Sequence, residues 1–453
     1  MSVAVAAPHP AAIDAAHTAV AAGGNAFDAA LAAAAALAVV YPHQCSVGGD
    51  LVAMVRPKGR PVQAILSIGA AAAAVDVNAL KAGMPLYGPQ TVTVPGVVAG
   101  WAAVHSNARL PLAALLAPAV RMAEDGVPFS PGLRAAIEAA KDRILADRGL
   151  AEIMLKPALV QPALAATLTR IGSDWRSFYS DPPLAKGLRD FGSPLSTADF
   201  AAHVAEVVTP LQATAGGVTW HAAPPPVQGE TFLAVVGSSS LLADSRRAQA
   251  DRDARLGDPR RGPLPPGAVP VPGPEPKGDT VAVTAVDDDG NAVALIQSVF
   301  ESFGAGLLDP GTGIVLHNRG SAFSLDPGHP ACIGPGLRPP HTLCPTIGTT
   351  TDDVIALGCQ GGRAQPWILA QVAPEALTAS DLSALVNRPR WILRGDDLIV
   401  EPGVTLSDTD GLTVSTTEGP HNDAGHVQIA RLRGTLLDAG SDRRADGLAA
   451  VLS

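Results

Sequence analysis

An α+β protein is expected from three features of the sequence. Helical patterns dominate residues 96–210, and residues 280–300 have the alternation of two strands joined by a turn. The composition, 47% hydrophobic and 16% charged, is that of a soluble protein with a sizeable core. A chain of 453 residues has room for two or three average domains or for one large layered unit.

Two helices are predicted near the N-terminus. The first begins at Pro10 and runs to about residue 22, where two glycines end it and Asn25 caps the next helix. That second helix, residues 26–40, is apolar on nearly every face, so we expect it to be packed on all sides. It is too short to span a membrane, which takes about 20 residues.

Strands and further helices follow from periodicity and turn residues. Strands are expected at 51–56 and 62–68, joined by the turn PKGR, and a hairpin is expected from 280–286 and 292–300 around the turn DDDGN. Two late helices are predicted at 365–373 and 381–386.

Residues 241–279 are highly charged and then rich in proline. They contain few large apolar side chains, so burial would not offset the entropy of ordering them. We therefore expect a flexible linker or exposed loop at the end of a first part, residues 1–279, followed by a second part, residues 280–453.

Bulk features also exclude some functions. The net charge of −10 argues against a general nucleic-acid binder. The four cysteines are scattered and form no CxxC pair, which favours reduced, buried thiols over a disulfide framework or a zinc site. The N-terminal residues lack the pattern of a signal peptide, so we expect a cytoplasmic protein without membrane contact. No metal or organic cofactor is implied.

Thr280 stands at the start of a strand, directly after the charged and proline-rich segment. If the Asp279–Thr280 bond is cut, Thr280 gains a free α-amine with a pKa of about 8, which can accept the hydroxyl proton. One residue would then supply both nucleophile and base. By itself this position is weak evidence, because many strands begin with a structural threonine.

Several blocks of the sequence are similar to the gamma-glutamyltransferase family, in the family's order and over nearly the whole chain. They are GGNAFDAALAAAAALAVVYPHQCSVGGD (23–50), TVTVPGVVAGW (91–101), DTVAVTAVDDDGNAVALIQSVF (279–300), PGLRPPHTLCPTI (335–347) and GCQGGR (358–363). The resemblance implies a four-layer αββα fold of the N-terminal nucleophile hydrolase type. It also implies a precursor that cuts itself into two chains, which stay associated, and an acyl-enzyme formed with an amide substrate.

The resemblance also implies roles for individual residues. Thr280 falls on the position of the nucleophile, Gly361 and Gly362 on the glycines whose backbone forms the oxyanion hole, and Ser298 on a hydroxyl residue near the nucleophile. Without the resemblance, the two glycines would be interpreted as a turn that enters a helix. Ser298 would be interpreted as a strand hydroxyl bonded to backbone.

The sequence departs from the family where typical members bind the amino-acid head group of the substrate. An arginine near residue 66 is replaced by an alanine run, and an asparagine on the second hairpin strand is replaced by Phe300. An acidic segment is replaced by NRGSAF and a serine pair by HT, so the substrate-binding candidates are Arg319, Ser321, His341 and Thr342. These variants resemble a side branch of the family that includes oxamate amidohydrolase. By this resemblance, Arg319 of this chain would bind a carboxylate of the substrate.

The sequence therefore predicts a self-processing threonine hydrolase that cleaves a small amide without an amino-acid head group. Two alternatives remain open. One is a gamma-glutamyltransferase or glutathione hydrolase with altered recognition, and the other is an uncleaved family member that acts as a binding protein.

Overall fold

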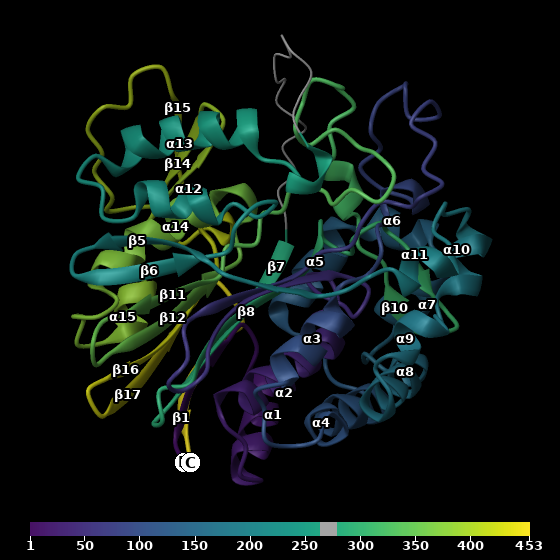
Figure 1. Cartoon of the computed structure of the whole chain (residues 1–453), viewed down its shortest axis with the longest axis horizontal. Helices are drawn as coiled ribbons and strands as arrows, with labels where there is room; N and C mark the ends of the chain where they lie inside the picture. Colours follow the sequence, from purple (N-terminus) through teal and green to yellow (C-terminus); the bar gives the residue numbers. More distant parts are fainter. Residues whose placement is uncertain (263–278) are drawn as a thin grey trace.

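Two antiparallel sheets face each other in the middle of the molecule and helices cover both outer faces, which makes four layers, αββα (Figure 1). This computed structural model describes residues 1–262 and 279–453. The predicted four-layer fold is therefore confirmed.

The first sheet has seven strands in the order β18-β1-β7-β8-β2-β3-β4. The predicted hairpin of β7 and β8 is confirmed, and it lies in the middle of this sheet. The predicted pairing of β2 with β3 is also confirmed. The strand bounds are β18 Leu448–Leu452, β1 Val3–Ala7, β7 Asp279–Asp287, β8 Ala292–Phe300, β2 Asp50–Arg56, β3 Gln63–Ser67 and β4 Glu206–Val208.

The second sheet has six strands in the order β17-β16-β12-β11-β6-β5. Their bounds are β17 Leu436–Ser441, β16 Val427–Arg433, β12 Val354–Cys359, β11 Thr346–Thr349, β6 Val218–Ala222 and β5 Leu211–Ala215. Two small sheets complete the strands: β9 Leu308–Asp309 with β10 Ile314–Val315, and β13 Trp391–Arg394 with β14 Asp397–Val400 and β15 Thr413–Thr416.

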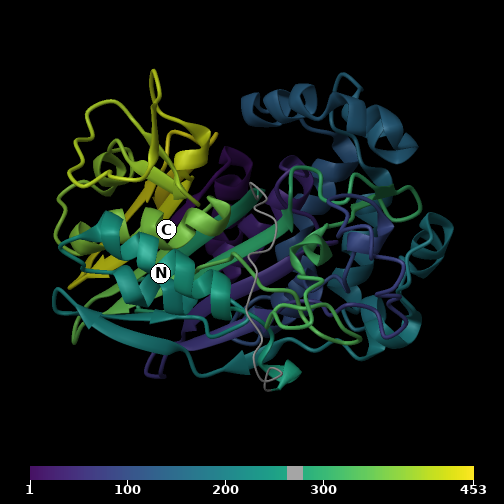
Figure 2. The ribbon, with the colours of Figure 1, turned by 90° about the horizontal axis from the view of Figure 1, so that it is seen from above.

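Helices α1 to α3 cover the outer face of the first sheet, and α12, α14 and α15 cover that of the second. Seen from above, helices α4 to α11 lie on the opposite side of the molecule from the C-terminal strands (Figure 2). The helix bounds are α1 Pro10–Ala21, α2 Ala26–Val40, α3 Val97–His105, α4 Leu112–Asp125, α5 Pro131–Ala139, α6 Lys141–Ala146, α7 Arg148–Met154, α8 Pro162–Ser173, α9 Ser177–Ser180, α10 Ala185–Phe191, α11 Thr197–Ala201, α12 Gly229–Val235, α13 Leu241–Arg255, α14 Gln365–Val372 and α15 Leu382–Val386.

The two N-terminal helices are confirmed, together with the residues that end and cap them. The side chain of Asn25 accepts from the N–H groups of Phe27 and Asp28, and Asp28 accepts from the Asn25 N–H in return, which is a capping box. Every residue of α2 is buried, because this helix packs against the first sheet, α1 and α4. Small alanine side chains allow that close approach on all sides.

Alternation along the strands decides which side chains meet between the sheets. Val52 of β2, Ala282 of β7 and Ile296 of β8 pack against Ile347 of β11 and Ala356 of β12 in this inner core. Asp50 comes two residues before Val52, and Ser298 comes two residues after Ile296. Because side chains alternate along a strand, Asp50 and Ser298 lie on the same inner face of the first sheet. They stand at the end of the sandwich where β7 begins and β12 ends.

The expectation of a flexible linker is wrong for residues 241–255, which form α13. Its charged side chains find partners: Asp251 pairs with Arg255 one turn along the helix, and Arg252 is only 6% exposed. The composition of this helix is too polar to predict that any of its residues is buried. Contacts of Arg252 with distant parts of the chain stabilise the helix. The expectation is also wrong just beyond α13, where Pro259–Arg261 form the short helical turn η2 and Asp258 pairs with Arg338, and at Asp279, which belongs to β7. Residues 263–278 of the expected linker lie outside the described residues.

Cys45, Cys332, Cys344 and Cys359 are buried free thiols, as the sequence predicts. Within the two described ranges, none of the helices combines the length and the apolar character that crossing a membrane would require.

Candidate active site

Thr280 is the second residue of β7 and is 1% exposed. Its Oγ1 donates a hydrogen bond of 3.1 Å to Oγ of Ser298 on the neighbouring strand. Ser298 Oγ in turn donates to the carbonyl oxygen of Asp279, at 2.6 Å, and accepts from the N–H of Phe300. The hydroxyl of Thr280 and the carbonyl of the peptide bond before it are thus linked through one serine.

A β-bulge produces this geometry. The register of β7 against β8 shifts between Asp279 and Val281, and Phe300 has a φ of 78°. Such bulges re-aim side chains next to active sites. Here the shift lets the Thr280 side chain reach Ser298 and leaves the Asp279 carbonyl within reach of the same hydroxyl.

The Asp279 side chain connects β7 to the second sheet. Its Oδ1 accepts from Nε2 of Gln360 at 3.4 Å. Burial, and then the nearby charge of Glu301, raise the pKa of Asp279 to about 6. Because Gln360 directly precedes Gly361, this hydrogen bond places the start of β7 beside the glycine pair.

Gly361 and Gly362 form a buried turn between β12 and α14. Both have positive φ, 145° and 53°, and a Cβ on Gly361 would lie 2.6 Å from Cδ1 of Ile368, so the turn requires glycine. Their carbonyls accept from Ala364 N–H and from Gln228 Nε2, each at 3.0 Å. Within the described part of the chain, the N–H groups of Gly361 and Gly362 have no acceptor. Buried backbone N–H groups without a partner are rare.

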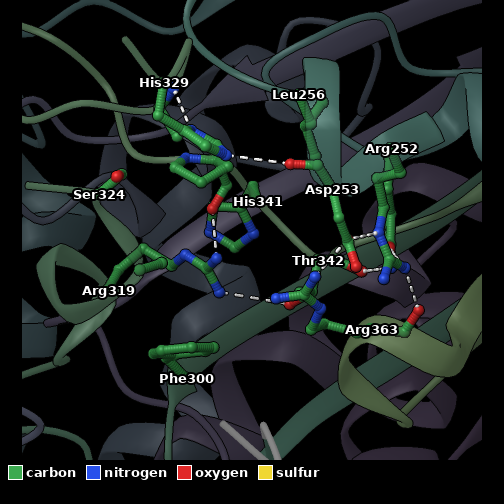
Figure 3. Close-up of a pocket in the computed structure, with 14 residues that line it drawn as sticks. Arg252, Asp253, Leu256, Phe300, Arg319, Ser324, His329, His341, Thr342 and Arg363 are labelled. Carbon is green, nitrogen blue, oxygen red and sulfur yellow. Dashed lines mark hydrogen bonds and ion pairs between the residues drawn. The ribbon is translucent and has the colours of Figure 1, made fainter. Parts of the chain in front are cut away.

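A pocket opens next to this turn (Figure 3). Phe300, the cross-strand partner of Asp279, forms part of its wall, and Thr342 and Arg363 form another part. Thr280 is not among the lining residues. The lining residues are Gln228, Arg252, Asp253, Leu256, Phe300, Arg319, Ala322, Ser324, His329, Ala331, Pro340, His341, Thr342 and Arg363.

Arg319 and Arg252 are both buried arginines of the pocket wall. Arg319 is 3% exposed, and its guanidinium lies 3.9 Å from the centre of the Phe300 ring. One terminal nitrogen donates to Thr342 Oγ1 at 3.3 Å and the other to the Pro340 carbonyl, whereas Nε has no hydrogen-bond partner in the described residues. Burial lowers the pKa of Arg319 to about 9. None of the described carboxylates lies within ion-pair distance of it.

His341 and Asp50 form a buried pair behind the pocket. His341 Nε2 is 3.3 Å from Asp50 Oδ2, and its Nδ1 accepts from the Leu343 N–H at 3.4 Å. Burial holds the pKa of His341 well below its usual range and raises that of Asp50 to about 8. With both ring nitrogens occupied, His341 shapes the pocket wall and has no nitrogen left to act as a base.

The structure therefore brings together Thr280, Ser298, Gly361 and Gly362, and it places Arg319, His341 and Thr342 on one pocket. Ser321 is the exception among the predicted substrate-binding residues. The short helical turn η3, Arg319–Ala322, directs its hydroxyl to the Asn318 carbonyl at 2.8 Å, and Ser321 does not line the pocket.

Sequence reasoning missed several polar residues of the site, among them Asp50, Gln228, Arg252 and Asp253. Asp50 ends the motif VGGD, which could equally be an ordinary turn. Arg252 and Asp253 lie in the segment that was expected to be a linker. One available indication was Asp50 itself, a charged residue directly before five apolar residues of a strand.

Comparison with known proteins agrees with this architecture. The model of the gamma-glutamyltranspeptidase family matches residues 12–265 and 238–452. The chain belongs to the gamma-glutamyltranspeptidase family. Like its relatives in that family, it is an amide-cleaving enzyme of the hydrolase or acyltransferase type.

Individual relatives of this gamma-glutamyltranspeptidase family member include proenzymes. It is 35% identical to the oxamate amidohydrolase proenzyme of Klebsiella pneumoniae subsp. pneumoniae, over 98% of this chain and 97% of that protein. It is 32% identical to the glutathione hydrolase-like YwrD proenzyme of Bacillus subtilis, over 82% of this chain and 81% of that protein. Its structure is similar to the crystal structure of cephalosporin acylase from Bacillus halodurans, with a TM-score of 0.88, 29% identity, and coverage of 99% and 95% of the two chains.

Proposed function

We propose that this family member cuts its own Asp279–Thr280 bond and then uses Thr280 as the nucleophile of an amide hydrolase. The observation that carries the proposal is the hydrogen-bonded chain from Thr280 Oγ1 through Ser298 Oγ to the Asp279 carbonyl. Ser298 polarises that carbonyl, and the threonine hydroxyl lies beside it.

In the first reaction, Thr280 Oγ1 attacks the carbonyl carbon of Asp279. The C–N bond breaks, the hydroxyl proton passes to the departing nitrogen, and an ester joins Asp279 to the threonine oxygen. Water hydrolyses this ester and leaves the chains 1–279 and 280–453. The new α-amine, with an ordinary pKa near 8, then accepts the hydroxyl proton of Thr280 when a substrate amide is attacked.

The turn at Gly361 and Gly362 fits the role of oxyanion hole. Its two N–H groups are buried, have no acceptor among the described residues, and belong to the turn that Gln360 joins to Asp279. Donors that are already oriented toward a developing negative charge lower the barrier by roughly 3 kcal/mol each.

Arg319 supports a substrate with a carboxylate and no amino-acid head group. A buried guanidinium without an ion pair favours an anionic ligand. Asp253 is the one carboxylate among the described lining residues, and it already contacts both Arg252 and Arg363. The pocket therefore offers a site for a substrate carboxylate but no uncommitted acid for an α-amine. Oxamate, the substrate named for the Klebsiella relative, has the matching chemistry.

A substrate panel on purified protein tests the proposal. A denaturing gel should show two chains, and their ends should be Asp279 and Thr280 by mass spectrometry. The processed protein should release ammonia from oxamate at a higher kcat/KM than it hydrolyses glutathione or a gamma-glutamyl anilide. Preference for glutathione would favour the gamma-glutamyl alternative, and a single uncut chain without amidase activity would favour a binding protein.

A further inference from the structure

The turn at Gly361 and Gly362 is held by its carbonyl groups. The carbonyl of Gly361 accepts from the Ala364 N–H, that of Gly362 from Gln228 Nε2 at 3.0 Å, and that of Arg363 from Arg252 Nη1 at 2.6 Å. Three successive carbonyls thus each have a donor. The carbonyl of Gly361 shares its peptide plane with the N–H of Gly362, so the bond from Ala364 orients that N–H directly. The bonds to the carbonyls of Gly362 and Arg363 fix the next two peptide planes, and they thereby restrain the backbone on which both glycine N–H groups depend.

Gln228 is 1% exposed and joins two loops of the site. Its Nε2 donates to the carbonyl of Thr342 at 2.5 Å as well as to that of Gly362. Both of its amide hydrogens are therefore used, one on the pocket wall and one on the turn.

Arg252 determines which way this amide points. Its Nη1 donates to Gln228 Oε1 at 3.0 Å. With the arginine on that side, only the orientation with Oε1 toward Arg252 and Nε2 toward the two carbonyls satisfies every group. The guanidinium is itself held 5.3 Å from the ring centre of Trp367 on α14, and Figure 3 shows it beside Asp253 and Arg363.

We propose that Gln228 and Arg252 are positioning residues, which orient the Gly361–Gly362 turn so that its two N–H groups face the oxygen of the reacting carbonyl. This inference rests on the proposed function. Both residues precede the 279–280 bond, whereas the turn follows it. Helix α13 of the first chain would therefore complete the oxyanion hole of the second chain, although its sequence resembles a linker.

The test uses full-length chains that carry Gln228→Glu, Arg252→Met or Arg252→Lys. The glutamate variant keeps the size of the side chain and its contact with Arg252, but it replaces the donating amide by an oxygen that repels both carbonyls. Arg247→Met is the matched control, because Arg247 lies on the same helix with its side chain 74% exposed. Each processed protein is assayed with oxamate, and with the gamma-glutamyl anilide if the wild type prefers it.

We expect kcat to fall about 10- to 100-fold in Gln228→Glu and Arg252→Met, with KM changed less than about twofold, because small displacements of catalytic groups act on the transition state. Arg252→Lys should recover part of kcat, since its ammonium can still donate to the Arg363 carbonyl. The double variant should be no worse than the poorer single variant, because the two residues act as one unit. Arg247→Met should behave as wild type.

A kcat within about threefold of wild type in both Gln228→Glu and Arg252→Met would overturn the inference, and so would a loss confined to KM. These outcomes differ from failure of the proposed function, in which the wild type itself cleaves none of the amides and both proposals fall. Cleavage at 279–280, followed on a gel, shows whether each variant has folded and matured before its kinetics are compared.

Discussion

Thr280 and Ser298 face each other across β7 and β8 with 3.1 Å between their hydroxyl oxygens, and Ser298 also donates to the carbonyl directly before Thr280. The same serine can therefore assist self-cleavage before the chain is cut and orient the nucleophile afterwards.

Removing either hydroxyl should stop or slow maturation. Thr280→Ala should remain a single chain without amidase activity, because no nucleophile is left. Ser298→Ala should be cleaved about 100-fold more slowly, since the Asp279 carbonyl loses its donor. The measurement is the band pattern on a denaturing gel during incubation of freshly purified protein.

Thr284→Val is the control for both variants. Thr284 lies on the same strand, is fully buried, and its hydroxyl has no hydrogen-bond partner in the described residues. It should be cleaved at the wild-type rate. Normal cleavage of Thr280→Ala would contradict the assignment of the nucleophile.

Gly361→Ala should damage the turn through strain. The new methyl group would meet Ile368 Cδ1 at 2.6 Å, and the backbone has a φ of 145°. We expect a loss of about 1–3 kcal/mol in the free energy of unfolding and a fall in kcat of at least about 100-fold.

Gly336→Ala separates strain from catalysis. Gly336 also has a positive φ, 69°, but a Cβ there would enter open space. This variant should lose about 1 kcal/mol of stability and keep its kcat. Equal kcat values for the two alanine variants would argue against an oxyanion role for Gly361.

Arg319→Met should weaken the binding of a carboxylate substrate. Loss of a buried charged hydrogen bond to the ligand should raise KM for oxamate about 100-fold. The methyl ester of oxamate has no charge for Arg319 to bind, so its KM should change little. Steady-state kinetics with both compounds tests this, and an equal increase for acid and ester would show that the arginine only maintains the shape of the pocket.

Asp50 should make stability depend on pH. Its pKa is raised by burial from 3.8 to about 8 in the folded protein, so between these pH values the unfolded chain ionises while the folded chain retains the proton. The contribution of Asp50 to stability is therefore greatest below about pH 4 and is lost as pH rises toward 8.

Asp50→Asn removes this titration. The stability of the variant relative to wild type should increase from pH 5 to pH 8, as measured by urea unfolding at each pH. Other ionisable groups contribute equally to both proteins and cancel in the comparison. A difference that stays constant across this range would show that Asp50 is ionised throughout.

Much of the fold could be predicted from local patterns. Pro10 and Asn25 mark helix starts, the turn at 287–291 marks a hairpin, and each element lies where its pattern places it. For the site, the family resemblance predicted roles for Thr280 and the glycine pair, and these roles stay predictions. It could not show that Ser321 turns away from the pocket, since that depends on how η3 is seated against its neighbours.

Residues 241–255 show the limit of local reasoning most clearly. Their composition gives no apolar face, so the sequence predicts a mobile linker, yet α13 is held by the contacts of Arg252 with Gln228, Arg363 and Trp367. These partners lie more than 20 and more than 100 positions away along the chain, and no local window contains them.

The sequence by itself determined the helices with strong caps, the central hairpin, and the position of Thr280 at the start of that hairpin. Only the tertiary structure decided that Asp50, Gln228 and Arg252 belong to the site. The physical reason is that periodicity and caps act within a few residues, whereas burying a polar or charged side chain is favourable only when distant segments supply its partners.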